Sequence, residues 1–97
     1  MININWTIEA IDDFEQNIEF LENRFSENEV QKFINKSQEV IDIISKNPNA
    51  FKTTKYKKVH CVTIVAQINL FYRITNNNNI ELLRFWNNYQ NPKDLNL

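Results

Sequence analysis

The spacing of apolar residues in the first half of the chain restricts its fold more than any other feature. Across residues 8–25 they recur every three or four positions, which places them on one face of a helix. A second pattern of this kind covers residues 30–46, and Asn47-Pro48 ends it because the residue before a proline is disfavoured in helical conformation. Two amphipathic helices with so short a connection are predicted to pack as an antiparallel hairpin.

Both predicted helices begin with capping residues. Thr7 is the predicted N-cap of the first helix. Ser26 and Glu29 are predicted to form a capping box, in which the Ser26 hydroxyl accepts from the Glu29 amide and the Glu29 carboxylate accepts from the Ser26 amide. The predicted core face of the first helix consists of Ile8, Ile11, Phe14, Ile18, Leu21 and Phe25. Its acidic residues are expected mostly on the solvent side, namely Glu9, Asp12, Asp13, Glu15, Glu19 and Glu22.

The rest of the chain predicts strands. Alternating apolar and polar residues predict a short strand at residues 2–6, and β-branched and aromatic runs predict three more at residues 59–65, 68–74 and 80–86. A tight turn at Ala66-Gln67 and a turn at residues 76–79 connect these last three strands. Because the chain has no Gly, Asn is expected to form the second turn through its tolerance of positive φ.

These elements predict one α+β domain over residues 1–97. It has an N-terminal strand, an antiparallel helix hairpin and a three-stranded antiparallel meander, with the hairpin on one face of a small, largely antiparallel sheet. The other face of the sheet is expected to be partly open. Residues 49–58 are expected to form a loop, and the tail from Asn87 to Leu95 is expected to be irregular.

Alternation along the last predicted strand assigns its side chains to two faces. Glu81, Leu83 and Phe85 are expected on one face, and Ile80, Leu82, Arg84 and Trp86 on the other. Arg84 beside Trp86 either borders a groove, where cation–π contact would serve a ligand, or extends past the helix hairpin toward water. In the preceding strand, Tyr72 is expected on the core side of the sheet and Phe71 on its back.

Composition excludes several classes of site. Without Gly, the chain has neither a P-loop nor a dinucleotide-binding fingerprint. Cys61 is the only cysteine, which excludes an intrachain disulfide and a Cys-rich zinc site, and we expect it to be a buried small hydrophobe. His60 is the only histidine, so no site with two His ligands forms, and we expect it at the surface or on an edge strand. We therefore expect no metal and no cofactor.

Charge is distributed unevenly along the chain. Residues 1–30 hold eight acids and one base, whereas residues 31–97 hold ten bases and four acids. No apolar run approaches the roughly 18 residues of a membrane span, and the N-terminus lacks the features of a signal peptide, so we expect a cytoplasmic protein without a membrane partner. The bases of one loop, Lys52, Lys55, Lys57 and Lys58, either bind phosphate or an acidic partner surface, or are merely solvated.

The order of elements and four local strings resemble the RelE/ParE superfamily of toxins from type II toxin–antitoxin modules. The resemblance spans nearly the whole chain, and the last string is the most specific because it matches the aromatic strand end and Asn-Pro closure of ParE-like plasmid-stabilisation proteins. The strings are Trp6-Thr7-Ile8-Glu9-Ala10, Asn47-Pro48-Asn49-Ala50-Phe51, Leu70-Phe71-Tyr72-Arg73-Ile74 and Phe85-Trp86-Asn87-Asn88-Tyr89-Gln90-Asn91-Pro92.

The resemblance implies two alternative activities. RelE-like members cut mRNA on the ribosome, and the corresponding catalytic set here would be Lys55, Lys57, Lys58, Arg84 and Tyr89. ParE-like members poison DNA gyrase and are not known to be hydrolytic. Asn69 stands where RelE-like toxins have a catalytic Arg, and Arg73 lies about 13 Å further along the strand, too far to replace it. This departure favours the ParE-like activity.

The resemblance also implies partners. A cognate antitoxin would wrap around the toxin, with a toxin–antitoxin hetero-oligomer as the expected assembly, and DNA gyrase or the ribosome with its mRNA would be the target. The residues expected to bind the target are Lys52, Lys55, Lys57, Lys58, Arg73, Arg84, Trp86 and Tyr89. A third alternative is an inactive family member that only binds its antitoxin.

Overall fold

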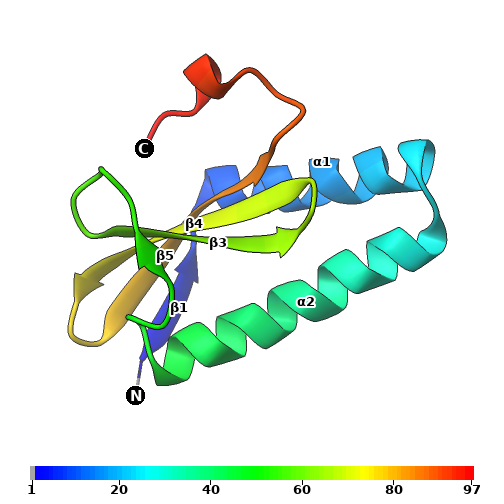
Figure 1. Cartoon of the computed structure of the whole chain (residues 1–97). Helices are drawn as coiled ribbons and strands as arrows, with labels where there is room; N and C mark the ends of the chain where they lie inside the picture. Colours follow the sequence, from blue (N-terminus) through cyan, green and yellow to red (C-terminus); the bar gives the residue numbers. More distant parts are fainter. Residues whose placement is uncertain (1) are drawn as a thin grey trace.

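The computed structural model describes residues 2–97 and has the predicted α+β architecture (Figure 1). Its two helices and the long strands lie close to their predicted positions, and one turn of 3₁₀ helix occurs in the tail. In chain order the elements are β1 (Asn3–Trp6), α1 (Ile8–Arg24), α2 (Glu27–Lys46), β2 (Lys52–Thr53), β3 (Val59–Val65), β4 (Ile68–Asn76), β5 (Asn79–Asn87) and the 3₁₀ turn Pro92–Asp94.

The strands form one five-stranded sheet in the order β1-β5-β4-β3-β2. The predicted antiparallel meander of β3, β4 and β5 is confirmed, and β1 joins β5 in parallel, which makes the sheet mixed. The prediction of a plain loop over residues 49–58 is wrong at Lys52-Thr53, which pair with Cys61 and His60. Two residues are too few to produce a detectable periodicity, so β2 could not be recognised from the sequence.

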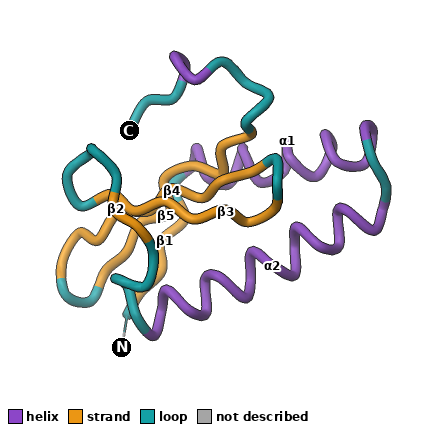
Figure 2. The backbone as a smooth tube through the Cα atoms, in the orientation of Figure 1, coloured by secondary structure: helices purple, strands orange, loops and turns teal. Residues whose placement is uncertain are grey.

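Both helices cover the same face of the sheet (Figure 2), and the main core lies between the helices and the sheet. α1 contacts β5, while α2 contacts β3 and, to a lesser extent, β1. Phe33 and Ile44 of α2 are fully buried against Leu70, Tyr72 and Leu82 of the sheet. None of the helices within residues 2–97 has the length and apolar character that a membrane crossing requires.

The buried face of α1 differs from the predicted one. Ile8, Ile11 and Phe25 are 75%, 43% and 43% exposed, so their placement in the core was wrong. Of the predicted face, Leu21 is buried and Phe14 and Ile18 pack against the core, while Ala10, Asp13 and Asn17 are the other residues that α1 buries. The expectation that Asp13 faces solvent is therefore also wrong. Burial of Asp13 and Asn17 is tolerable because both are hydrogen-bonded to β5.

A β-bulge in β5 changes the predicted faces of that strand. Arg84 pairs with Phe71 and Leu82 pairs with Tyr72, which leaves Leu83 as an extra residue on β5. The alternation shifts by one after the bulge, so Phe85 joins the core on the helix side, contrary to the prediction. The predicted grouping of Arg84 and Trp86 with Ile80 and Leu82 is wrong for the same reason.

The helix caps agree with the prediction only in part. The Thr7 hydroxyl accepts a hydrogen bond from the Ala10 amide at 3.1 Å, as an N-cap should. The Ser26 side chain makes no capping bond, and the Glu29 amide donates to the Ser26 carbonyl at 3.1 Å. The Glu29 carboxylate instead lies 3.3 Å from Lys32 Nζ, so the predicted capping box does not form.

The Asn-rich turn forms without positive φ. Lys58, at φ 62°, is the only non-Gly residue with positive φ within residues 2–97, so the proposed reason for Asn in this turn is wrong. The Asn76 side-chain oxygen accepts from the Asn78 amide at 2.9 Å and from the Asn79 side chain at 3.1 Å. Asn is therefore suited to this turn by its hydrogen-bonding side chain. The tight turn at Ala66-Gln67 is confirmed.

The tail folds back over the sheet face opposite the helices, called here the outer face (Figure 1). Asn91 caps the short 3₁₀ turn by accepting from the Lys93 amide at 3.0 Å. Beyond it, Leu95 and Leu97 pack against Val59, Phe71 and Trp86. The tail thus contains an ordered turn that was not predicted, and it covers part of the face that was expected to be open.

Candidate functional site

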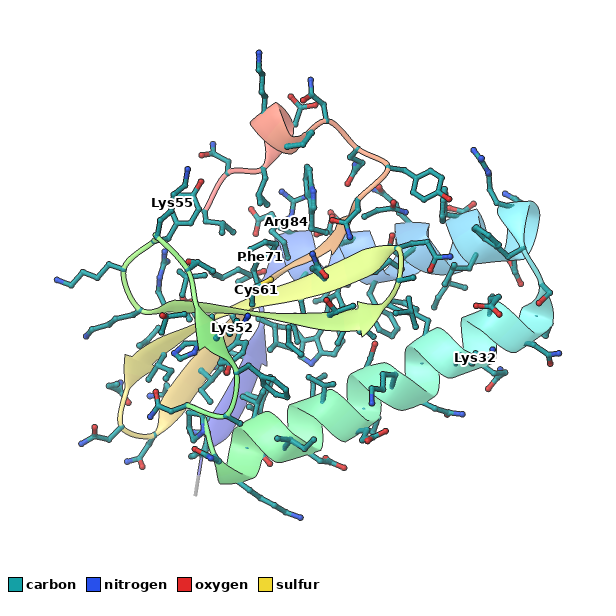
Figure 3. All side chains as sticks on the ribbon, viewed as in Figure 1. Lys32, Lys52, Lys55, Cys61, Phe71 and Arg84 are labelled. Carbon is teal, nitrogen blue, oxygen red and sulfur yellow. The ribbon has the colours of Figure 1, made fainter. Side chains whose placement is uncertain are left out.

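A row of residues crosses the outer face from one strand to the next. Lys52 pairs with Cys61, Cys61 with Phe71, and Phe71 with Arg84. Figure 3 shows these four labelled residues following one another in that order across β2, β3, β4 and β5. Since paired residues point to the same face, the row has a cation at each end and apolar side chains between them.

The neighbouring positions extend this surface. Val59, Phe71 and Trp86 are buried beneath the tail, and Tyr56, Cys61 and Leu83 are partly buried around them. Arg73 pairs with Val59 and with Glu81, and Trp86 pairs with Asn69, so both also belong to the outer face. The structure therefore brings four of the predicted target-binding residues to one face, namely Lys52, Arg73, Arg84 and Trp86.

Arg84 is held by two contacts of different kinds. Its guanidinium carbon lies 5.2 Å from the centre of the Trp86 ring, a cation–π geometry. Its Nε and Nη2 donate to the two carboxylate oxygens of Asp13 at 2.6 and 2.9 Å. The hydrogen-bonded Asp13 carboxylate raises the pKa of Arg84. Neither predicted alternative describes Arg84, because its cation–π contact is with Trp86 of the same strand and its guanidinium ends on a buried carboxylate rather than in water.

The basic segment between β2 and β3, called here the lysine loop, is held together by hydrogen bonds of Thr54. The Thr54 hydroxyl accepts from the Tyr56 amide and donates to the Val59 carbonyl, both at 3.1 Å. Lys55 Nζ lies 5.4 Å from the centre of the Tyr56 ring. The loop lysines are exposed, and within residues 2–97 none of them forms an ion pair. The loop thus presents uncompensated positive charge beside the outer face.

Lys58 adopts a strained conformation in this loop. The Val59 amide donates to the Tyr56 carbonyl at 3.2 Å, which closes a turn with Lys57 and Lys58 at its centre. Lys58 has φ of 62° there, a region that residues with a Cβ rarely occupy. The hydrogen-bonded turn places two adjacent lysines at an exposed apex.

Tyr89 lies apart from the lysine loop. Tyr89 follows the end of β5. The end of β5 pairs with the start of β4, and the start of β4 pairs with the end of β3. The lysine loop precedes the other end of β3, and seven residues of strand span about 20 Å. The Tyr89 ring instead contacts Phe20 at 5.1 Å and Arg24 at 5.4 Å, on α1. The structure does not bring the lysines and Tyr89 together.

His60 and Cys61 lie on opposite faces of the sheet and do not form a reactive pair. His60 is 4% exposed, which corrects the prediction of a surface or edge position, because β2 covers the edge of β3. Its Nδ1 lies 2.8 Å from the Phe51 carbonyl oxygen, and its ring stacks on Tyr72 at 5.0 Å. Cys61 is half-buried on the outer face, and burial raises the pKa of its thiol. Cys61 is therefore a small apolar side chain that is half-buried, rather than fully buried as predicted.

Tyr72 is a core residue, as predicted, and Phe71 lies on the opposite face. The Tyr72 hydroxyl donates to the Pro48 carbonyl at 2.7 Å. Burial raises the pKa of Tyr72 to about 12, so this hydroxyl stays protonated at neutral pH. Both Tyr72 and His60 therefore fasten the segment after α2 to the sheet and take no part in a surface site.

Sequence reasoning missed a polar cluster between α1 and β5. Asp13, Asn17 and Asn87 are buried and hydrogen-bonded to one another or to β5. They line a cavity of about 220 Å³ together with Gln16, Phe20, Phe85, Tyr89 and Gln90. The four-residue spacing of Asp13 and Asn17 was the available signal, since it matches the spacing of Asn17 and Leu21 on the buried face. No cluster of potential metal ligands occurs within residues 2–97.

A model of one protein family, described as the ParE toxin of the type II toxin–antitoxin system parDE, matches residues 4–92. The chain belongs to the ParE toxin family. Its α+β fold, with an N-terminal strand, two helices and the strands of one sheet, is that of RelE/ParE toxins. Comparison with curated proteins gives no match.

Three solved structures illustrate the similarity of the fold. The chromosomal ParDE toxin–antitoxin system from P. aeruginosa has a chain with TM-score 0.73 and 17% identity, covering 90% of this chain and 96% of that one. The YoeB/ParE toxin from Agrobacterium tumefaciens gives 0.65 and 18%, with coverage of 86% and 94%. The YoeB dimer from Staphylococcus aureus gives 0.63 and 16%, with coverage of 87% and 93%.

Proposed function

We propose that this ParE-family toxin inhibits growth by binding an essential target such as DNA gyrase, without hydrolysing RNA, and that a cognate antitoxin neutralises it. The carrying observation is Asn69, which stands on the outer face where a RelE-like ribonuclease needs an Arg. The Asn69 side chain accepts from the Thr63 hydroxyl at 2.9 Å and donates to Asn88 at 3.4 Å. An amide in such a network supplies no positive charge for a phosphorane transition state.

The other candidate catalytic groups support the same conclusion. Arg84 is paired with Asp13, which neutralises its charge. Tyr89 and the lysine loop lie at opposite ends of β3, so they do not flank one scissile phosphate. General acid–base catalysis requires groups within hydrogen-bonding reach of the same reacting atoms. The arrangement therefore supports binding rather than RNA hydrolysis.

The outer face has the chemistry of a protein-binding surface. Its centre is apolar: the tail covers Phe71 and Trp86, Tyr56, Cys61 and Leu83 remain partly exposed around them, and Lys52, Arg73 and the lysine loop provide a cationic margin. Interfaces commonly combine buried aromatic residues with a polar rim, and the charged rim accelerates association with an acidic partner. Such a face would suit an acidic surface of the target.

Similar solved structures support an antitoxin partner. They include the chromosomal ParDE toxin–antitoxin system from P. aeruginosa and a heterotetrameric YoeB–YefM toxin–antitoxin complex from Staphylococcus aureus. We propose that this toxin likewise forms a hetero-oligomer with its antitoxin. Covering the apolar centre and the cationic margin of the outer face would remove the target-binding surface.

A lysine series in a DNA supercoiling assay with purified gyrase tests this proposal. Single changes to Ala at Lys52, Lys55, Lys57 and Lys58 are expected to raise the half-inhibitory concentration about twofold to fivefold each, as screened surface charges do. Lys32→Ala is the matched control, because Lys32 lies on α2 away from the outer face (Figure 3) and should leave inhibition unchanged. Complete loss of toxicity from one lysine would instead indicate a catalytic group.

A further inference from the structure

Within residues 2–97, the second half of β5 has no neighbouring strand on its α1 side. β1 pairs with β5 only as far as Trp6 and Leu82, whereas β5 continues to Asn87. The backbone amides and carbonyls beyond Leu82 therefore need other partners on that side, since buried backbone groups without partners are costly.

Side chains at the start of α1 and along its buried face provide these partners. The Thr7 hydroxyl lies 2.8 Å from the Leu82 carbonyl oxygen, to which it donates. Asp13 Oδ2 accepts from the Phe85 amide at 3.1 Å, and Asn17 Nδ2 donates to the Phe85 carbonyl at 2.9 Å. Asp13 and Asn17 are four residues apart and so lie on the same helix face. Together they bind both backbone groups of Phe85, as a neighbouring strand would.

The same two side chains continue into the candidate target-binding residues. Asp13 binds the Arg84 guanidinium through both carboxylate oxygens. Asn17 Oδ1 accepts from the Asn87 side chain at 3.2 Å, and Asn87 Oδ1 accepts from the Tyr89 amide at 2.9 Å. A continuous chain of hydrogen bonds thus runs from α1 to the backbone of Tyr89.

We propose that Asp13 and Asn17 are positioning residues, which hold the end of β5 so that Arg84, on the buried Trp86 ring, and Tyr89 present one fixed geometry to the target. This inference rests on the proposed target-binding function. Neither side chain needs to touch the target, because each acts through the residues that it orients. Loss of either side chain would lower the population of the binding-competent geometry and weaken binding in proportion.

The experiment measures target inhibition and local order in Asp13→Asn and Asn17→Ala. Both variants are expected to raise the half-inhibitory concentration in the supercoiling assay by at least about tenfold, with unchanged inhibition at saturation. Hydrogen exchange is expected to accelerate at the Phe85 and Tyr89 amides relative to the Leu70 amide in the centre of the sheet. Ile44→Val, in the core of α2, is the matched control for a general loss of stability.

A second substitution separates positioning from stability. Ser37→Ala is expected to raise the stability of each variant, because the buried Ser37 hydroxyl has no hydrogen-bond partner. If positioning is the role of Asp13 and Asn17, Ser37→Ala raises the melting temperature of each variant but leaves its half-inhibitory concentration unchanged. Recovery of inhibition together with stability would overturn the proposal.

Two further results keep the two proposals distinguishable. Variants that inhibit as well as Ile44→Val would overturn the positioning role and leave the target-binding function intact. A wild-type protein that inhibits no target would overturn the proposed function. Even then, unchanged exchange at Phe85 and Tyr89 in the variants would show that Asp13 and Asn17 do not order the end of β5.

Discussion

Arg84 and Asp13 form a bidentate ion pair, with nitrogen–oxygen distances of 2.6 and 2.9 Å between residues 71 positions apart. Only 19% of the Arg84 side chain and 10% of the Asp13 side chain are exposed. The pair joins the first helix to the last strand, beside the point where β1 ends. It therefore links the scaffold of the fold to the outer face.

Removal of one partner of this pair is expected to be strongly destabilising. Asp13→Ala leaves Arg84 and the Phe85 amide without their acceptor and should lower the free energy of unfolding by about 3 kcal/mol. Urea denaturation followed by circular dichroism measures this change. Asp12→Ala, at the adjacent exposed position, should change stability by less than about 0.5 kcal/mol. Equal effects of the two substitutions would contradict the assignment of the pair.

Lys58→Gly is expected to stabilise the protein. Gly adopts φ near 62° without the clash that a Cβ causes, and relief of this strain should add about 1 kcal/mol to the free energy of unfolding. Lys57→Gly removes the same charge from the same turn, at a residue without positive φ, and so is the control. It should leave stability unchanged or reduce it. A lower melting temperature for Lys58→Gly than for the wild type would count against the strain.

Ser37→Ala is expected to raise the melting temperature. The Ser37 hydroxyl is buried in α2 and has no hydrogen-bond partner among residues 2–97, and Ala also has the higher helix propensity. The expected gain is about 1 kcal/mol in the free energy of unfolding. Differential scanning calorimetry tests it, with Ser45→Ala as a comparison, since the Ser45 hydroxyl donates to the Asp42 carbonyl. A loss of stability in Ser37→Ala would show that the hydroxyl has a partner in solution.

Tyr72 is expected to make stability fall at alkaline pH. Burial raises its pKa to about 12, so the folded state disfavours the phenolate relative to the unfolded state. The protonated Tyr72 hydroxyl therefore adds about 2 to 3 kcal/mol to the free energy of unfolding. This contribution is complete below pH 10, the approximate unfolded pKa, and is lost as pH rises toward 12. Urea midpoints at several pH values between 8 and 12 test this. Tyr72→Phe should lose less stability across this interval, and an equal loss would contradict the burial of the hydroxyl.

The sequence predicts the elements of this fold better than the faces that they bury. Helical periodicity placed both helices, and runs of β-branched and aromatic residues placed the antiparallel meander. The periodicity failed for part of α1, where Asp13 and Asn17 are buried and hydrogen-bonded to the Phe85 backbone while Ile8 is exposed. Such bonds depend on a strand 68 residues or more away, which no local pattern records.

The candidate site was predictable in part for the same reason. Lys52, Arg73, Arg84 and Trp86 were expected among the target-binding residues, and they lie on one face. Two features had no local signal. The bulge at Leu83 reverses which side chains of β5 face the helices beyond it. The tail folds back and covers Phe71 and Trp86. Both depend on pairing and packing between distant segments.

Primer extension on a translated reporter mRNA, after brief induction of the protein in a bacterial host, tests the central claim most directly. Growth is recorded in the same culture, and an uninduced culture is the control. A non-hydrolytic ParE-family toxin predicts growth arrest with intact reporter mRNA. Cuts in phase with the codons would contradict this account and establish a ribosome-dependent endonuclease.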